Sequence, residues 1–130
     1  MITEDFVSLE IAKLLKEKGF NEPCECFYDT EHNNIPLVNG WMNMSNSQLE
    51  EREFLCYSAP TLQMAMKWLR KEHNIHIAVI VSYHHIPRRY EAHIMKLENI
   101  DDFILHPQVD FASYEEACEA AIKYCLENLI

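Results

Sequence analysis

Five polar residues between positions 82 and 93 carry the side chains best suited to chemistry in this chain: Ser82, His84, Arg89, Glu91 and His93. If the two strands of a hairpin carry them, all five share one face of the sheet. A carboxylate beside an imidazole can hold the ring in one tautomer, as a general base requires. We therefore take His84, Glu91 and His93 as the candidate site residues. The competing interpretation is an ordinary solvated face of an antiparallel sheet.

The cysteines and glycines favour no metal site and no phosphate-binding loop. Cys24 and Cys26 share a face of a predicted strand, but no second cysteine pair has the spacing of a zinc site. Cys118 and Cys125 lie on one predicted helix, about 10 Å apart along its axis, which is too far for a disulfide. The chain has only two glycines, whereas phosphate loops need clustered glycines. We expect no metal and no cofactor.

The polar face depends on a hairpin, which the sequence predicts over about residues 75–96. The alternating apolar residues of its first strand should face the core: Ile75, Ile77, Val79, Val81 and Tyr83. We expect a four-residue turn at 85–88 to return the chain as the second strand. This turn predicts four cross-strand pairs: His84 with Arg89, Ser82 with Glu91, Ile80 with His93, and Tyr83 with Tyr90.

About three helices should pack against this sheet, over about residues 5–18, 60–73 and 113–128. Gly19 and Phe20 suit the end of the first helix, and Ser113 with Glu116 forms a capping box for the third. Further strands at 24–29 and 54–58 should join the hairpin. Residues 30–53 are the least clear part of the sequence, with a weak strand signal at 37–42 and a single helical turn at 48–53. The predicted fold is α+β, with one antiparallel sheet in a single domain, 1–130.

The net charge of −10 is unevenly distributed along the chain. Residues 1–63 and 97–130 each carry a net −7, whereas residues 64–96 carry a net +4. An acidic chain repels phosphate, so we do not expect it to bind nucleic acid directly. No apolar run approaches the roughly 18 residues of a membrane span, so we expect no membrane partner. Five cysteines without a secretory leader indicate reduced thiols and a cytoplasmic location.

Three blocks of helix and cap residues suggest kinship with other proteins. They are IAKLLKEKGF at 11–20, APTLQMAMKWLR at 59–70 followed by HNI at 73–75, and SYEEA at 113–117 with AIKYCL at 121–126. These blocks resemble a family of short uncharacterised proteins from gut-dwelling anaerobic bacteria, often encoded by prophages or other mobile elements. The family has no established activity, so the resemblance implies kinship and no site residues.

The sequence therefore favours a small acidic accessory protein that binds another protein, and the resemblance adds the expectation that it serves a mobile element. One variant is a mimic of nucleic-acid charge, which would need Asp101, Glu115, Glu116 and Glu119 along one exposed ridge. The main alternative is a small-ligand binder or an enzyme that uses the face with His84, Glu91 and His93. A homodimer joined through exposed hairpin edges is a further alternative.

Overall fold

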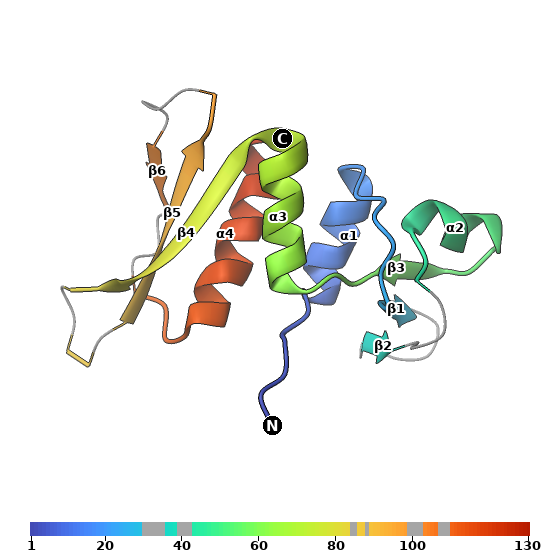
Figure 1. Ribbon diagram of the computed structural model, residues 1–130, viewed down its shortest axis with the longest axis horizontal. Coiled ribbons are helices and arrows are strands. Elements are labelled where there is room, and N and C mark those ends of the chain that lie inside the picture. The colour runs from blue at the N-terminus through green and yellow to red at the C-terminus, as the bar shows by residue number, and fades with distance from the viewer. Residues whose placement is uncertain (30–35, 39–42, 84–85, 88, 99–102, 107–109) are drawn as a thin grey trace. The chain divides into compact units, whose positions relative to one another are not determined.

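The computed structural model describes residues 1–29, 36–38, 43–83, 86–87, 89–98, 103–106 and 110–130. Helices and antiparallel strands both occur in this part of the chain, which confirms the predicted α+β class. The chain divides into two compact units, Met1–Gln63 and Met64–Ile130. Figure 1 labels the elements of both units, and each unit is described by itself below.

The first unit contains a small sheet with the strand order β2-β1-β3. Its elements are α1 (Leu9–Glu17), β1 (Cys26–Asp29), β2 (Pro36–Val38), α2 (Asn46–Glu51) and β3 (Cys56–Ser58). Both α1 and α2 pack against β3, which lies between the two helices (Figure 1). The first helix begins later than predicted because residues 5–7 are extended. There the amide of Val7 donates to the carbonyl of Pro60 (3.0 Å), and the amide of Leu62 donates to the carbonyl of Asp5 (2.9 Å).

Both helices of this unit end in a Schellman motif, but different residues occupy the left-handed position. After α1, Gly19 has φ +94° and the amide of Phe20 closes the motif, as predicted. After α2, Glu53 has φ 61° and the amide of Phe54 donates to the carbonyl of Leu49 (2.9 Å). Glycine adopts this conformation freely, whereas an L side chain costs roughly 1–2 kcal/mol.

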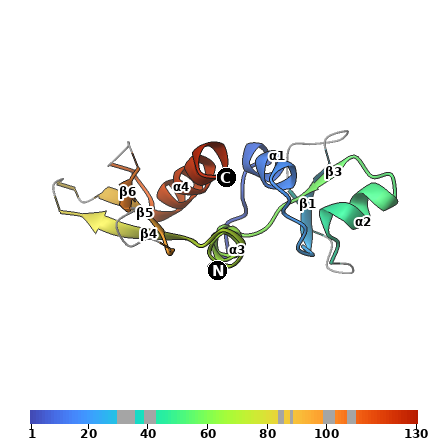
Figure 2. The same ribbon diagram turned by 90° about the horizontal axis from the view of Figure 1, so that it is seen from above.

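The second unit contains a sheet with the strand order β4-β5-β6, so β4 is an edge strand among the strands that the structure describes (Figure 2). Its elements are α3 (Leu62–His73, whose first two residues lie in the first unit), β4 (Ile75–Ser82), β5 (Arg89–Lys96), β6 (Phe103–Leu105) and α4 (Tyr114–Asn128). Helix α4 packs on β4 and β5. Ser113 caps this helix as predicted, because its Oγ accepts from the amide of Glu116 (3.1 Å). The reciprocal bond of a capping box is displaced by one residue, since the Glu116 carboxylate accepts from the amide of Ala112 (3.2 Å).

The strands predicted at 24–29 and 54–58 exist, but their predicted place in the hairpin's sheet is wrong. They form β1 and β3 of the separate sheet in the first unit, where Tyr28 lies opposite Tyr57. In the second unit, β6 pairs with β5 and places Ile104 opposite Ile94. Each sheet is therefore completed by strands from its own unit. Burial explains this pairing better than closeness in sequence, because β3 is nearer to β4 than to β1 along the chain, yet Cys26, Tyr28, Cys56 and Ser58 are all buried in the first sheet.

The predicted hairpin is confirmed, but its predicted register is wrong by two residues. Arg89 pairs with Ser82, which removes the predicted partner of His84. Tyr83 is 79% exposed and has left the ladder, so Tyr90 lies opposite Val81. The paired part of β4 therefore ends at Ser82, two residues before the predicted end of the first strand. A shift of two residues keeps every side chain on its predicted face, because the side-chain period of a strand is two.

Burial explains why the observed register is preferred. It places Ile77 opposite Ile94, and both side chains are buried. The predicted register would have placed Lys96 opposite Ile77 and moved Ile94 toward the tip of the hairpin. Burial on this face fades toward the tip, where Val79 and Val81 are only half-buried. The prediction that the core face extends to Tyr83 is therefore wrong.

Candidate functional site

The structure brings together two of the three predicted site residues. Glu91 and His93 are neighbours on one face of β5, and Oε1 of Glu91 lies 2.9 Å from Nε2 of His93. Their side chains are only 16% and 23% exposed. A partly buried carboxylate at this distance fixes the orientation of the imidazole. His84, the third predicted residue, lies outside the described residues.

The neighbours of this pair limit the chemistry that it can perform. Ile80 lies opposite Glu91 and Ala78 lies opposite His93 on β4. Ser82, predicted to face Glu91, pairs with Arg89 instead. The adjacent positions of β4 therefore present apolar side chains where a nucleophile or a second acid would be needed. The contact supports a positioned histidine but does not by itself make a catalytic site.

All five cysteines are buried, and burial makes the thiols poor nucleophiles. Desolvation raises the pKa of Cys24 to about 12, with further contributions from Cys26 and Glu22. Burial likewise raises the pKa of Cys118 to about 11 and that of Cys125 to about 12. Within the described ranges, no three His, Cys, Asp or Glu side chains gather into a group that could hold a metal ion.

We expect these thiols to make the protein less stable in alkali. Below pH 9, the thiols are protonated in both the folded and the unfolded chain. Above pH 9, the unfolded thiols lose their protons while the folded ones keep them up to about pH 11 or 12, so the free energy of unfolding falls. Denaturant titrations at several pH values measure this decline.

The matched control for the alkaline effect is Cys118→Ala, which should show a shallower decline. Alkylation by iodoacetamide at pH 8 should be slow in native protein and fast in denaturant. Rapid alkylation of native Cys118 or Cys125 would contradict the protected state of these thiols.

The open edge of β4 offers a binding surface of a different kind. Tyr90 exchanges two backbone hydrogen bonds with Phe111, both 2.9 Å long, so its N–H and C=O point away from β4. Its partner Val81 therefore directs its own N–H and C=O away from β5, toward the open edge. The alternation of an antiparallel ladder gives Val79 the same orientation. These backbone groups are placed to pair with an added strand.

Little in the sequence of β4 protects this edge. The strand IHIAVIVS spans eight residues and contains no charged residue, proline or glycine. Natural edge strands are commonly blocked by charges, prolines or bulges, because an open edge invites another strand. Ile80 is 38% exposed on the face away from Val79 and Val81, and Ile86 is fully exposed in the turn. The tip half of the hairpin thus combines open backbone groups with exposed apolar side chains.

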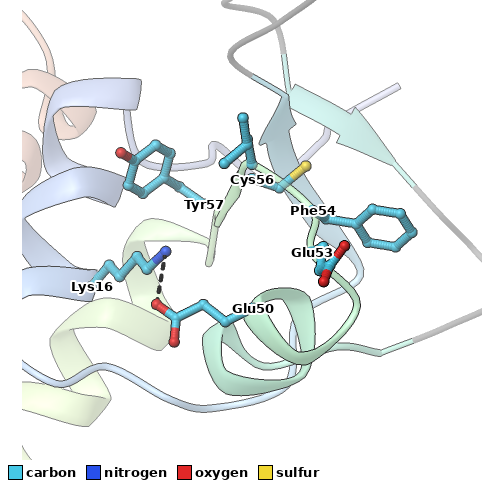
Figure 3. Close-up of a pocket in the computed structure, with 7 residues that line it drawn as sticks. Lys16, Glu50, Glu53, Phe54, Cys56 and Tyr57 are labelled. Carbon is cyan, nitrogen blue, oxygen red and sulfur yellow. Dashed lines mark ion pairs between the residues drawn. The ribbon is translucent and has the colours of Figure 1, made fainter.

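A cleft of about 420 Å³ lies in the first unit, where the sequence suggested no site. Its lining comes from the end of α1, the end of α2, the segment after α2 and β3 itself: Lys16, Glu50, Glu53, Phe54, Leu55, Cys56 and Tyr57. Figure 3 shows Lys16 pointing to Glu50, with Tyr57 on one side of the cleft and Phe54 on the other. We refer to this feature as the α1–α2 cleft.

Lys16 is held in the α1–α2 cleft by a carboxylate and an aromatic ring. Its Nζ lies 3.1 Å from Glu50 Oε1 and 5.0 Å from the centroid of the Tyr57 ring. Lys13 Nζ lies 5.8 Å from the same centroid. Such geometry is typical of cation–π contacts. Sequence reasoning missed the cleft because Lys16 and Glu50 are far apart in the chain.

Comparison of the chain with protein-family models, curated proteins and solved structures found no match. Each helix among the described residues is too short or too polar to cross a membrane. Three structural features are the candidates for a functional site: the Glu91–His93 pair, the open edge of β4 and the α1–α2 cleft.

Proposed function

We propose that this protein is a small acidic cytoplasmic accessory protein that binds another protein by accepting an added strand at β4. The observation that supports the proposal is the uncharged eight-residue edge strand, whose Val79 and Val81 direct backbone groups outward. Strand addition gives affinity through main-chain hydrogen bonds and specificity through alternate side chains. The sequence resemblance to mobile-element proteins extends the proposal to an accessory role for such an element.

Charge indicates what kind of strand the partner contributes. Residues 75–96 contain three basic residues and one acidic residue, against eight basic and twenty acidic residues in the rest of the chain. The hairpin is therefore the part of the chain that an acidic segment can approach most easily. We propose an extended partner segment with alternating apolar residues beside β4 and acidic residues at its ends.

Affinity purification from the native host, followed by mass spectrometry, identifies the partner, and calorimetry with the purified pair tests the edge. Val81→Pro removes an outward N–H without removing a hydrogen bond to β5, so the hairpin should still fold. We expect this variant to weaken binding roughly tenfold or more. A carbonyl of the added strand would lose the N–H of residue 81 as its donor, and the proline ring would obstruct the edge. Val81→Thr keeps the N–H and the β-branched shape and should bind like the wild type. Equal affinity of all three proteins would exclude the β4 edge as the binding site.

A second copy of the chain is the competing occupant of the same edge. An antiparallel pair of β4 strands would bring no like charges together, because the strand is uncharged. The net charge of −10 on each copy opposes this association. Light scattering over a concentration series distinguishes the two occupants. A dimer mass in the wild type that is lost in Val81→Pro would show that a second copy of the chain, and not a different protein, pairs with this edge.

A small-ligand binder or enzyme using His84, Glu91 and His93 is the second candidate function. The 2.9 Å contact between Glu91 and His93 favours it, whereas the apolar Ala78 and Ile80 opposite them do not. Loss of partner binding in His93→Ala but not in Val81→Pro would favour this face over the edge. The charge-mimic variant stays a prediction. Glu115 and Glu116 are exposed on α4, but Asp101 lies outside the described residues.

A further inference from the structure

We infer that the α1–α2 cleft binds a small organic cation with an apolar body. This site lies in the first unit and is independent of the proposed strand addition at β4, which uses the second. The cleft volume of about 420 Å³ falls in the range of small-molecule sites, which is roughly 300–1,000 Å³. The apolar rim of the cleft, its charges and the conformation of Glu53 support this assignment.

Two consecutive apolar side chains at the rim are left in water. Phe54 is 47% exposed and Leu55 is 65% exposed, and both follow the left-handed Glu53 that ends α2. Across the cleft, the ring of Tyr57 provides a second aromatic surface (Figure 3). Apolar side chains around a hollow gain free energy when a ligand removes them from water. The rim therefore fits the apolar body of a ligand.

The charges in the cleft select a cation. Two carboxylates, Glu50 and Glu53, line it with a single ammonium, Lys16. Lys16 already lies beside Glu50, and among the described residues the carboxylate of Glu53 has no cationic partner within ion-pair distance. Residues 1–63 also carry a net −7, which attracts cations and repels anions. An ammonium placed beside Glu53 satisfies the charge that the protein leaves unpaired.

The position of Lys16 shows that this cleft can hold an ammonium. Its Nζ is placed by one carboxylate and by the ring of Tyr57 at 5.0 Å. A ligand would use the same two kinds of group on the opposite side, with Glu53 as the carboxylate and Phe54 as the ring (Figure 3). A carboxylate and an aromatic ring, the two groups that hold the Lys16 ammonium, thus occur again at Glu53 and Phe54.

The backbone at Glu53 supports a role for its side chain. Glu53 adopts φ 61° at the position where Gly19 ends α1 in the same motif. Glycine would relieve the strain at this position, so the glutamate is not explained by local folding. Strained residues of this kind are often found where a side chain serves a binding site. The left-handed turn also directs the chain into Phe54 and Leu55 at the rim.

The test is a titration of ¹⁵N-labelled protein followed by amide chemical shifts, with phenethylammonium as the probe. We expect saturable shifts at residues 53–57, whereas 3-phenylpropionate, with the same ring and the opposite charge, should bind at least roughly fivefold more weakly. Equal binding of the two probes, or shifts confined to other residues, would overturn the inference.

Matched variants assign the effect to Glu53. Glu53→Gln removes the charge and should weaken phenethylammonium binding roughly fivefold at constant ionic strength. Glu51→Gln removes an exposed charge from α2 that does not line the cleft, and it should leave the affinity unchanged. Unchanged binding in Glu53→Gln, or equal weakening in both variants, would show that the cleft does not recognise the cation through Glu53. Unperturbed spectra outside residues 50–57 confirm that each variant is folded.

Discussion

Asn46→Ala should lower the free energy of unfolding by about 3 kcal/mol, because it leaves two buried backbone groups without partners. Asn46 is only 4% exposed at the start of α2. Its Nδ2 donates to the carbonyl of Phe20 (2.9 Å), and its Oδ1 accepts from the amide of Ser58 (3.0 Å). One side chain thereby joins α2 to β3 and to the segment that follows α1. Denaturant unfolding measures the loss.

The control for Asn46 is another asparagine with exposed hydrogen bonds. Asn21 Oδ1 accepts from the amide of Ser47 (2.9 Å) and from its hydroxyl (2.8 Å), at an exposed position. Asn21→Ala should therefore cost less than about 1 kcal/mol, since water replaces the lost partner. A loss in Asn46→Ala no greater than that in Asn21→Ala would contradict the bridging role of Asn46. Hydrogen exchange at the amide of Ser58 should also become faster in Asn46→Ala.

Ile122→Ala should destabilise the second unit by about 3 kcal/mol, since it removes buried methyl groups and leaves a cavity. Ile122 is fully buried on α4, the helix that packs on β4 and β5. Its neighbours along the buried stripe are Cys118 and Cys125, which bring the helix backbone close to the sheet. Thermal or denaturant unfolding measures the effect, and the far-ultraviolet spectrum confirms that the variant remains folded.

Two substitutions bracket the expected effect at Ile122. Ile122→Val removes a single methylene and should cost about 1 kcal/mol. Ile80→Ala changes the same residue type at a position that is 38% exposed and should cost less than the buried substitution. Similar losses for Ile80→Ala and Ile122→Ala would contradict the packing of α4 as the core of this unit. A large loss at Ile80 would also show that the outer face of the hairpin is covered in solution.

Local patterns predicted the elements well where a helix or strand carried its own signals. Gly19, Ser113 and Glu116 marked helix ends that the structure confirms, because capping depends on neighbouring residues alone. The start of α2 escaped prediction, although Ser45 and Gln48 form a capping box there. No apolar stripe long enough to indicate a helix follows this box, since α2 is only six residues long.

The sequence predicted the shared face of Glu91 and His93 but not their cross-strand neighbours, and the reason is geometric. The alternation of a strand placed Glu91 and His93 on one face, and this survives a register shift of two residues. The predicted cross-strand neighbours on β4 were wrong, because which residues lie opposite Glu91 and His93 depends on the register. That register follows the burial of Ile77 against Ile94, which the turn sequence does not encode.

By itself, the sequence determined the α+β class, the hairpin and the principal helices, because these follow from hydrophobic periods and caps within a few residues. Tertiary structure alone decided which strands share a sheet, which edge stays open, and where Lys16, Glu50 and Glu53 form a cleft. Such arrangements depend on contacts between segments distant in the chain. Several pairings satisfy the same local pattern, and burial selects among them.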